Sequence, residues 1–394
     1  MKRLSSLALL VLIAVTAGSP ALFADEMTEV YRQIYQQSAS LQDKYNAIQN
    51  LIALDDRSVA PILSEALSDL ILTQASYKSF VDKPLYGRTV QLVAAGIGKY
   101  KAADAAHSLW DVVQQVDDPL AQSEALMALG QIRALDYAER ISKMLSDLNL
   151  APTADPDKGE KLAFGCIVAL DKLKDLRGFA PVFFASDGWY SQRTRQLALK
   201  ALPNITDDPT DPVTAIITNE TATRKSLALK LELGSAAPPD RKAVTAILAL
   251  GIGHLQSNAN SPEVARNFGD FRKIALRGLI QLGVKDPAAV DAERKSYDNG
   301  YDSEEQLLGL QALGVNGGDA AATALSSILK RLNDEVGSGL LDAGRQRMAR
   351  AAIAAATATK NPIVRPVLYL IANNNQWSDS VMNDASAALK TFKQ

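Results

Sequence analysis

Residues 122–145 read QSEALMALGQIRALDYAERISKML, and this stretch decides the fold. Ala125, Leu129 and Ile132 are separated by four and three positions, which places them on one face of a helix. A polar break follows, and residues 138–148 then carry a second apolar stripe with helical spacing. The stretch therefore predicts two helices joined by a tight turn.

The same unit recurs along the chain. Small or apolar residues with similarly spaced partners mark its copies, at Ala47, Val93, Ala125, Cys166, Ala198, Ala246, Ala275, Gly309, Ala351 and Ala385. Most intervals between these markers have the length of a two-helix repeat. A helical hairpin buries only one side of itself, so it needs a neighbour on each remaining apolar face. We therefore expect an all-α fold, an α-solenoid of stacked helical hairpins with roughly 8–10 repeats.

Each copy runs from polar residues through A-L-x-A-L-G and a short turn with Asp or Gly to a second helix with spaced leucines. The clearest copies are SEALMALGQIRALDYAERISKML, KLAFGCIVALDKLKDLRGFAPVFF and EQLLGLQALGVNGGDAAATALSSIL. This pattern resembles HEAT-like repeats, in particular the short subtype found in phycobilin lyases. The resemblance covers most of residues 40–390 and implies an armadillo-like helical architecture. Pro203 departs from it, because it stands where a first helix would continue.

The chain begins with the pattern of a secretory signal peptide. Lys2 and Arg3 precede the apolar run LALLVLIAV, and small residues follow before Asp25. The apolar run is much shorter than the roughly 20 residues that span a bilayer. We therefore expect residues 1–24 to be a cleavable signal peptide and the mature protein to be periplasmic or secreted.

The rest of the chain, residues 25–394, is expected to form the solenoid. Residues 25–54 would cap its N-terminal end and residues 378–392 its C-terminal end. Pro, Gly and Asp gather in four segments that predict inserts between hairpins and not linkers between independent domains. These segments are residues 151–159, 203–212, 234–240 and 257–262.

Charge and cysteine content restrict the partners. The chain of 394 residues has a net charge of −2, which gives no bulk attraction to nucleic acid or to anionic lipid. We therefore expect no nucleic-acid binding and at most an indirect membrane association. Cys166 is the single cysteine and lies in an apolar run, so it is interpreted as a buried hydrophobic residue in a protein without intrachain disulfides.

Catalytic and metal-binding signatures are missing from the sequence. It holds none of the common zinc, P-loop, nucleophile-elbow or dinucleotide motifs. His107 and His254 are interpreted as structural or surface residues. Asp207, Asp208 and Asp211 lack the spacing of a calcium loop. We expect a non-enzymatic protein with no cofactor, no metal and no catalytic residue.

A binding surface is the stronger expectation. In a helical-hairpin solenoid the second helices are expected to line the concave face, here residues 57–70, 138–148, 179–186, 288–297, 320–332 and 363–372. Aromatic side chains beside arginine are enriched at protein interfaces. The candidate protein-binding residues are therefore Phe183, Phe184, Trp189, Tyr190 and Arg193, and also Arg345, Arg347 and Arg350. The alternatives are phenylalanines in the core, Trp189 over a repeat junction and a solvated arginine face.

These observations favour an exported protein-binding scaffold that holds another protein, of the cell envelope, in the groove of the solenoid. The resemblance to lyase-type repeats implies a different class, a tetrapyrrole lyase or chaperone-like protein. A third class is a structural envelope component that assembles with itself. The oligomeric state, the partner and the pathway stay open at this point.

Overall fold

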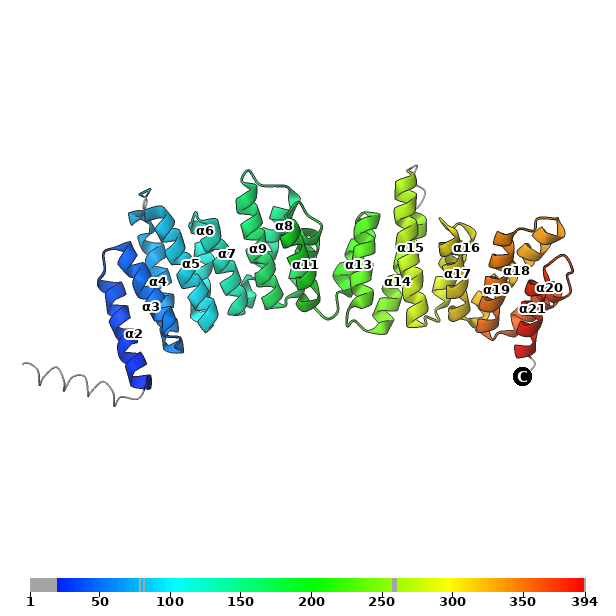
Figure 1. Cartoon of the computed structure of the whole chain (residues 1–394), viewed down its shortest axis with the longest axis horizontal. Coiled ribbons are helices and arrows are strands. Elements are labelled where there is room, and N and C mark those ends of the chain that lie inside the picture. Colours follow the sequence, from blue (N-terminus) through cyan, green and yellow to red (C-terminus); the bar gives the residue numbers. More distant parts are fainter. Residues whose placement is uncertain (1–19, 78, 81, 257–260, 393–394) are drawn as a thin grey trace, which may run out of the picture. The chain divides into compact units, whose positions relative to one another are not determined.

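The computed structural model describes residues 20–77, 79–80, 82–256 and 261–392. In these ranges the only regular elements are α-helices and short 3₁₀ helices. The chain divides into two compact units, Met1–Thr206 and Asp207–Gln394, and within each unit the helices stand side by side in chain order (Figure 1). The all-α, solenoid-like fold expected from the sequence is confirmed.

Paired helices build the first unit. The first helices of the pairs are α3 (Leu41–Ala53), α5 (Asp82–Tyr100), α7 (Pro119–Gln131), α9 (Pro156–Leu173) and α11 (Gln192–Ile205). The second helices are α4 (Ala60–Thr73), α6 (Ala106–Gln115), α8 (Ala138–Leu150) and α10 (Phe179–Ser186). Another helix, α2 (Pro20–Gln37), precedes them and packs on α3. Each first helix packs on the first helix of the next pair, so the apolar faces form a continuous core.

The second unit repeats the arrangement. Its first helices are α13 (Ala222–Gly234), α15 (Pro262–Leu282), α17 (Ser303–Asn316), α19 (Ala343–Thr359) and α21 (Asp379–Thr391). Its second helices are α12 (Thr210–Asn219), α14 (Pro239–Leu255), α16 (Val290–Asp298), α18 (Gly318–Gly337) and α20 (Arg365–Ala372). The leucine that the pattern predicts to be buried in α17, Leu310, has no exposed surface, and the same holds for Leu129 of α7.

The repeat register differs from the sequence expectation at one place. Ala246 was aligned with the first helices, but it lies on α14, which packs against α12 and α16 as a second helix does. Ala228 of α13 holds the equivalent first-helix position, because α13 packs on α15. Both helices carry small residues at helical spacing, so the spacing alone does not say which helix of a pair is which.

Several first helices end in a turn that contains a left-handed residue. After α7, the Arg133 N–H donates to the Gly130 carbonyl and the Ala134 N–H donates to the Leu129 carbonyl, both at 3.0 Å. This pattern is the Schellman motif, whose central residue adopts the left-handed conformation. The same conformation follows other first helices, at Asp55, Lys101, Lys174, Gly283 and Lys360. The recurring turn gives these pairs their helix–turn–helix geometry.

The sequence analysis predicted one solenoid over residues 25–394, whereas the structure divides the chain into two compact units. The division between the units lies at Thr206–Asp207, inside the insert of residues 203–212. Helices α2 and α3 cover the segment expected to form the N-terminal cap, and α21 covers the expected C-terminal cap. The capping roles themselves stay predictions. The predicted signal peptide lies outside the described residues up to residue 19, and α2 begins at Pro20.

Candidate binding surface on the first unit

Glycines bring the first helices of the first unit into close contact. A β-carbon built on Gly130 of α7 would lie only 2.7 Å from the Cα of Ala169 in α9. One built on Gly98 of α5 would lie 3.2 Å from the Cα of Ala128 in α7. Both glycines occupy the last turn of their helices, so the close approach draws together the turns that follow α5, α7 and α9.

These turns surround an open hollow of about 730 Å³, which we name the turn groove. Its charged lining residues are Lys99, Lys101, Glu124, Arg133, Asp171, Lys172 and Lys174. Ligand sites in proteins usually have volumes of about 300–1,000 Å³. The turn groove is therefore large enough to accept a segment of another molecule.

Some of the cations in the turn groove have acidic partners and others do not. The Lys99 ammonium lies 2.6 Å from the Asp55 carboxylate, and the Lys172 ammonium lies 3.0 Å from the Asp171 carboxylate. The remaining cations are exposed and form no ion pair with any described part of the chain; they are Lys101, Arg133 and Lys174. Positive charges without a partner therefore face one hollow in a chain whose net charge is negative.

The same three cations have an unusual backbone conformation. Lys101, Arg133 and Lys174 have φ angles of 57°, 58° and 56°, in the left-handed region. For a residue with a side chain this conformation costs about 1–2 kcal/mol, and glycine usually fills the position. Attraction between a cation and the helix C-terminus stabilises the fold by about 0.3–1 kcal/mol. The attraction offsets only part of the strain; Asp55 and Lys360 share the conformation, so it belongs to the repeated turn and is not special to this groove.

A second hollow, of about 260 Å³, adjoins the turn groove; we name it the helix groove. Glu124 lines both hollows and joins them. The apolar side chains of the helix groove are Leu120, Met127 and Phe164. On its α11 side, the guanidinium of Arg193 lies 5.5 Å from the centre of the Phe164 ring. The two grooves thus follow the first helices α5, α7, α9 and α11.

Two glutamates in the grooves have different electrostatic surroundings. Burial raises the pKa of the Glu124 carboxyl, and a hydrogen bond from Gln91 opposes this only in part. Burial also acts to raise the pKa of Glu160, but hydrogen bonds from Ser191 and Thr194 outweigh it, so this pKa lies below its usual range. The Glu160 carboxylate is held at the start of α11 and is not directed at the unpaired cations.

The predicted aromatic cluster is divided between the core and a helix junction. Phe183 is fully buried, and its ring meets that of the half-buried Phe184 edge to face. The Trp189 indole N–H donates to the Leu148 carbonyl at 2.9 Å. The buried Tyr190 hydroxyl donates to the side-chain oxygen of Asn149, also at 2.9 Å. Phe183 therefore belongs to the core, whereas Trp189 and Tyr190 join the segment after α10 to the end of α8.

Arg193 is the member of that set that reaches a groove, since it lines the helix groove. The other predicted arginines lie in the second unit. Arg345 forms ion pairs with Glu335 and Asp342, and Arg350 forms one with Asp384 at 2.6 Å. Arg347 is exposed. Arg345 and Arg350 are thus neutralised by acidic partners, and the three arginines do not form a stripe of unpaired positive charge.

Sequence reasoning missed the turn-groove cations. The signal that identifies them is positional, because a lysine or arginine stands one or two residues after the end of α5, α7 and α9. The missing information was the left-handed turn and the glycine contacts that bring these turns together. The hollows of the first unit described above also follow first helices, whereas the sequence directed attention to the second helices.

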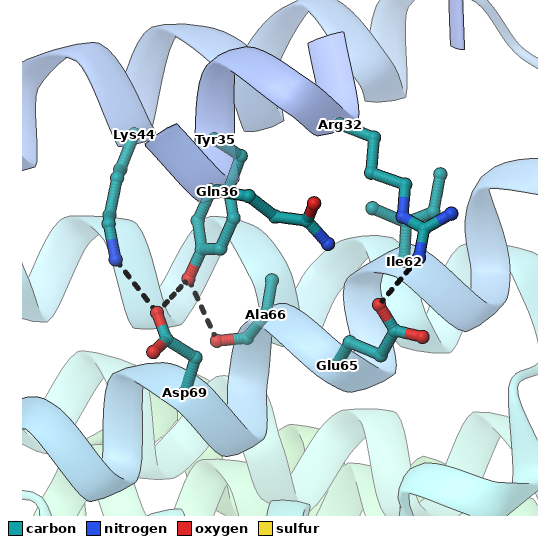
Figure 2. A pocket seen from close by; sticks show the side chains of 8 residues that line it. All are labelled: Arg32, Tyr35, Gln36, Lys44, Ile62, Glu65, Ala66 and Asp69. Carbon is teal, nitrogen blue, oxygen red and sulfur yellow. Dashed lines mark hydrogen bonds and ion pairs between the residues drawn. The ribbon is translucent and has the colours of Figure 1, made fainter. Parts of the chain in front are cut away.

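A smaller hollow of about 250 Å³ lies among α2, α3 and α4 (Figure 2). The Tyr35 hydroxyl lies 3.0 Å from the Asp69 carboxylate and 3.1 Å from the Ala66 carbonyl. The Lys44 ammonium reaches the same carboxylate at 2.8 Å. Burial and the nearby Asp69 raise the pKa of Tyr35, so this side chain stays a neutral tyrosine. These contacts pair Tyr35 and Lys44 with Asp69, and they tie α2 and α3 to α4.

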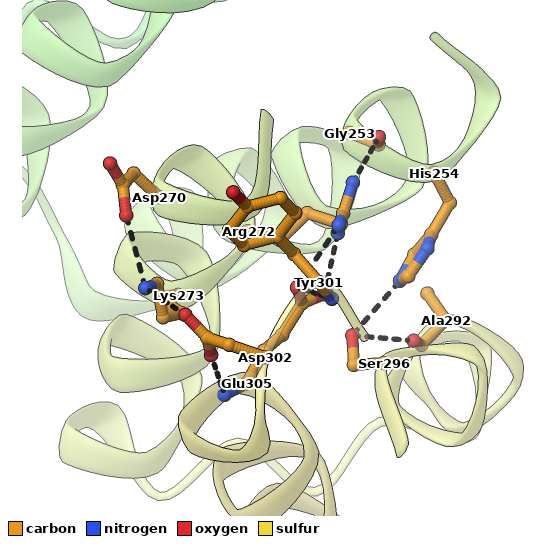
Figure 3. Close-up of polar contacts among 10 residues, drawn as sticks. All are labelled: Gly253, His254, Asp270, Arg272, Lys273, Ala292, Ser296, Tyr301, Asp302 and Glu305. Carbon is orange, nitrogen blue, oxygen red and sulfur yellow. Dashed lines mark hydrogen bonds and ion pairs between the residues drawn. The ribbon is translucent and has the colours of Figure 1, made fainter. Parts of the chain in front are cut away.

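Polar groups also cross the core of the second unit (Figure 3). The His254 ring nitrogen lies 2.9 Å from the Ser296 hydroxyl. Burial, with the positive charge of Arg272 nearby, lowers the pKa of His254 to about 4. His254 is therefore neutral at physiological pH.

His107 of the first unit is exposed and lies 3.7 Å from Asp111.

Cys166 lies in the core as the sequence indicated. It has no exposed surface, and burial raises the pKa of its thiol to about 12. Across the described ranges, no group of three or more His, Cys, Asp or Glu side chains is arranged to hold a metal ion. None of the helices described here is long and apolar enough to span a bilayer.

No family model matches the chain, and no curated protein is detectably similar to it.

Proposed function

We propose that this protein is an exported, non-enzymatic scaffold, built of HEAT-like repeats, that binds another cell-envelope protein along the first helices of its first unit. One observation carries the proposal: the turn groove and the helix groove meet at Glu124 and together follow four successive first helices. Such a surface is open to water along its length, which suits recognition of a partner better than enclosure of a small substrate.

The repeat assignment rests on two features. Helices pack in neighbouring pairs, and the same left-handed turn recurs between the helices of several pairs. These features support HEAT-like hairpins as the repeating unit. Export rests on the basic start, the short apolar run and the small residues of residues 1–24. Together they suggest a periplasmic or secreted binding protein.

A photo-crosslinking amino acid tests the proposal. It is placed at Leu120, which lines the helix groove and is 48% exposed, in cells that express the full chain. The matched control is placed at Lys143 on the second helix α8, whose side chain is 74% exposed. We expect irradiation to link one dominant envelope protein to the Leu120 position and not to the Lys143 position, as read by mass spectrometry.

Other results would contradict the proposal. Equal capture at both positions would show that the groove is not the binding surface. Crosslinks only between copies of this chain would support a self-assembling structural protein, and a copurified tetrapyrrole would support a lyase or chaperone-like role.

A further inference from the structure

We propose that the turn groove and the helix groove bind an extended acidic segment of a partner protein. Aspartate and glutamate side chains of the segment pair with Lys101, Arg133 and Lys174, and its neighbouring apolar side chains enter the helix groove. The inference rests on the proposed scaffold function and adds the chemistry of the partner.

Charge in the turn groove is the first argument. Lys101, Arg133 and Lys174 lie on three successive turns, are exposed, and have no ion pair within the described ranges. The acids of this groove are engaged differently. Asp171 accepts a hydrogen bond from Asn204 at 2.7 Å and pairs with its neighbour Lys172. The turn groove thus keeps positive charge available for carboxylates from outside the chain.

The spread of the cations indicates an extended ligand. Neighbouring helices pack about 8–10 Å apart, so three successive turns cover about 16–20 Å. An extended peptide advances about 3.3 Å per residue, so about five or six residues cover this distance. A compact anion would reach one turn, whereas a short extended segment reaches all three.

The helix groove favours a peptide over a uniformly anionic polymer. Leu120, Met127 and Phe164 offer apolar surface that continues directly into the turn groove. The charged residues of this groove are two acids, Glu124 and Glu160, and two cations, Lys161 and Arg193, so it adds no net positive charge for a ligand with a negative charge at every unit. A peptide can match both grooves, because a single chain can carry apolar side chains for the helix groove and acidic side chains for the turn groove.

Glycine substitutions separate binding from folding. The variant Lys101→Gly/Arg133→Gly/Lys174→Gly removes the three charges, and glycine adopts the left-handed conformation without strain. Lys360→Gly is the matched control, since Lys360 has a φ of 54° at the equivalent turn of the second unit. Thermal unfolding followed by circular dichroism verifies that both variants fold.

The probe is a fluorescein-labelled peptide in which leucines precede a run of glutamates, measured by fluorescence anisotropy with the full chain. We expect binding that weakens as salt increases, because added ions screen the charges. The triple variant should bind at least about tenfold more weakly, and Lys360→Gly should bind like the unmodified chain. A poly-glutamate peptide should bind more weakly than the leucine-containing peptide.

Several results would overturn the inference. One is failure of the unmodified chain to bind the peptide, and another is unchanged binding by the triple variant. A third is binding of inorganic polyphosphate or phosphatidylglycerol vesicles, dependent on the same cations, in place of the peptide.

Crosslinking from Leu120 in the triple variant separates this inference from the proposed function. If the triple variant captures the same partner as efficiently as the unmodified chain does, the scaffold function stands and the acidic segment is excluded. Loss of capture in the triple variant alone supports both. Absence of any partner in both chains counts against the scaffold function, while peptide binding still decides the chemistry of the groove.

Discussion

Arg272 of α15 and Glu305 of α17 form an ion pair whose side chains are 3% and 0% exposed (Figure 3). The guanidinium Nε lies 2.5 Å from one carboxylate oxygen, and Nη2 lies 3.0 Å from the other. Nη1 also donates to the Gly253 carbonyl, and the carboxylate accepts the Tyr301 N–H. The pair therefore joins two first helices, a second helix and the loop before α17 inside the second unit.

Removal of one partner of this pair should destabilise the second unit strongly. Glu305→Leu leaves the Arg272 charge buried without its partner, which costs about 3–5 kcal/mol. The double variant Arg272→Met/Glu305→Leu removes both charges and should be less destabilised than the single variant. Urea unfolding followed by the fluorescence of Trp377, with Trp110 and Trp189 replaced by phenylalanine, reports on the second unit.

Lys273→Met provides a comparison for the buried pair. Its side chain is 10% exposed, and its ammonium pairs with Asp270 at 3.0 Å and Asp302 at 2.9 Å. These carboxylates are 56% and 36% exposed, so water compensates them after the change. We expect a smaller loss of stability than for Glu305→Leu. An equal loss of stability in Lys273→Met and Glu305→Leu would show that complete burial of the Arg272–Glu305 pair does not determine the cost of breaking it.

The stability of the second unit should depend on pH through Glu293. Burial raises the pKa of this carboxyl to about 7, and hydrogen bonding from Asn316 opposes the shift only in part. Between about pH 4.5 and 7, the folded chain keeps a proton that the unfolded chain has lost. The free energy of unfolding should therefore fall as the pH rises through this window, by on the order of 1–3 kcal/mol, and then level off.

Glu293→Gln isolates this contribution, because glutamine keeps the shape and accepts the same hydrogen bond without titrating. His254 acts in the opposite direction, since its lowered pKa makes the fold gain stability as the pH rises from about 4 to 6.5. We therefore compare the pH dependence of the free energy of unfolding in the unmodified chain and in Glu293→Gln, because the contribution of His254 is the same in both. Glu263→Gln, at an exposed carboxylate, is the control. Identical profiles for Glu293→Gln and the unmodified chain would show that Glu293 does not cause this pH dependence.

The fold could be predicted from the sequence because each helix of such an array marks its buried face by apolar residues at helical spacing within a short segment. Leu129 and Leu310 follow the helical period of their neighbours, and both are buried. The same spacing could not decide that Ala246 belongs to a second helix, because this depends on which helices meet across pairs.

The candidate site was harder to predict for a related reason. An aromatic side chain such as Phe183 serves equally well in a core or at an interface, so its type did not predict its burial. The convergence of Lys101 and Arg133 depends on glycine contacts between helices and on left-handed turns. Neither feature is visible in the charge pattern, although the cations themselves are.

A charge placed in the core of the first unit should destabilise it severely. Leu129 has no exposed surface, so Leu129→Asp buries an unpaired carboxylate between neighbouring pairs. We expect a loss of more than about 4 kcal/mol or failure to fold. Leu135→Asp is the control, because Leu135 is 52% exposed at the turn after α7. A Leu129→Asp protein that melts like the Leu135→Asp protein would show that the packing register is wrong.

The contact between α7 and α9 should be sensitive to a single methyl group. Alanine normally stabilises a helix by about 1 kcal/mol relative to glycine. At Gly130, however, the added carbon would meet backbone atoms of Ala169 at 2.7 and 2.9 Å, and backbone cannot rotate away as a side chain does. We therefore expect Gly130→Ala to lose about 1–3 kcal/mol and to separate the turns that carry Arg133 and Lys174.

Gly251 of α14 offers the matched control for this change. A β-carbon built there meets no atom within 4 Å, so Gly251→Ala should gain about 0.5–1 kcal/mol from helix propensity alone. Urea unfolding measures both variants, and anisotropy with the acidic peptide measures the groove. Opposite signs of the two stability changes, with peptide binding weakened only by Gly130→Ala, would link the close approach of the first helices to the binding surface. A gain in stability at Gly130 would show instead that the helices move apart freely, and the cations would then not depend on that contact.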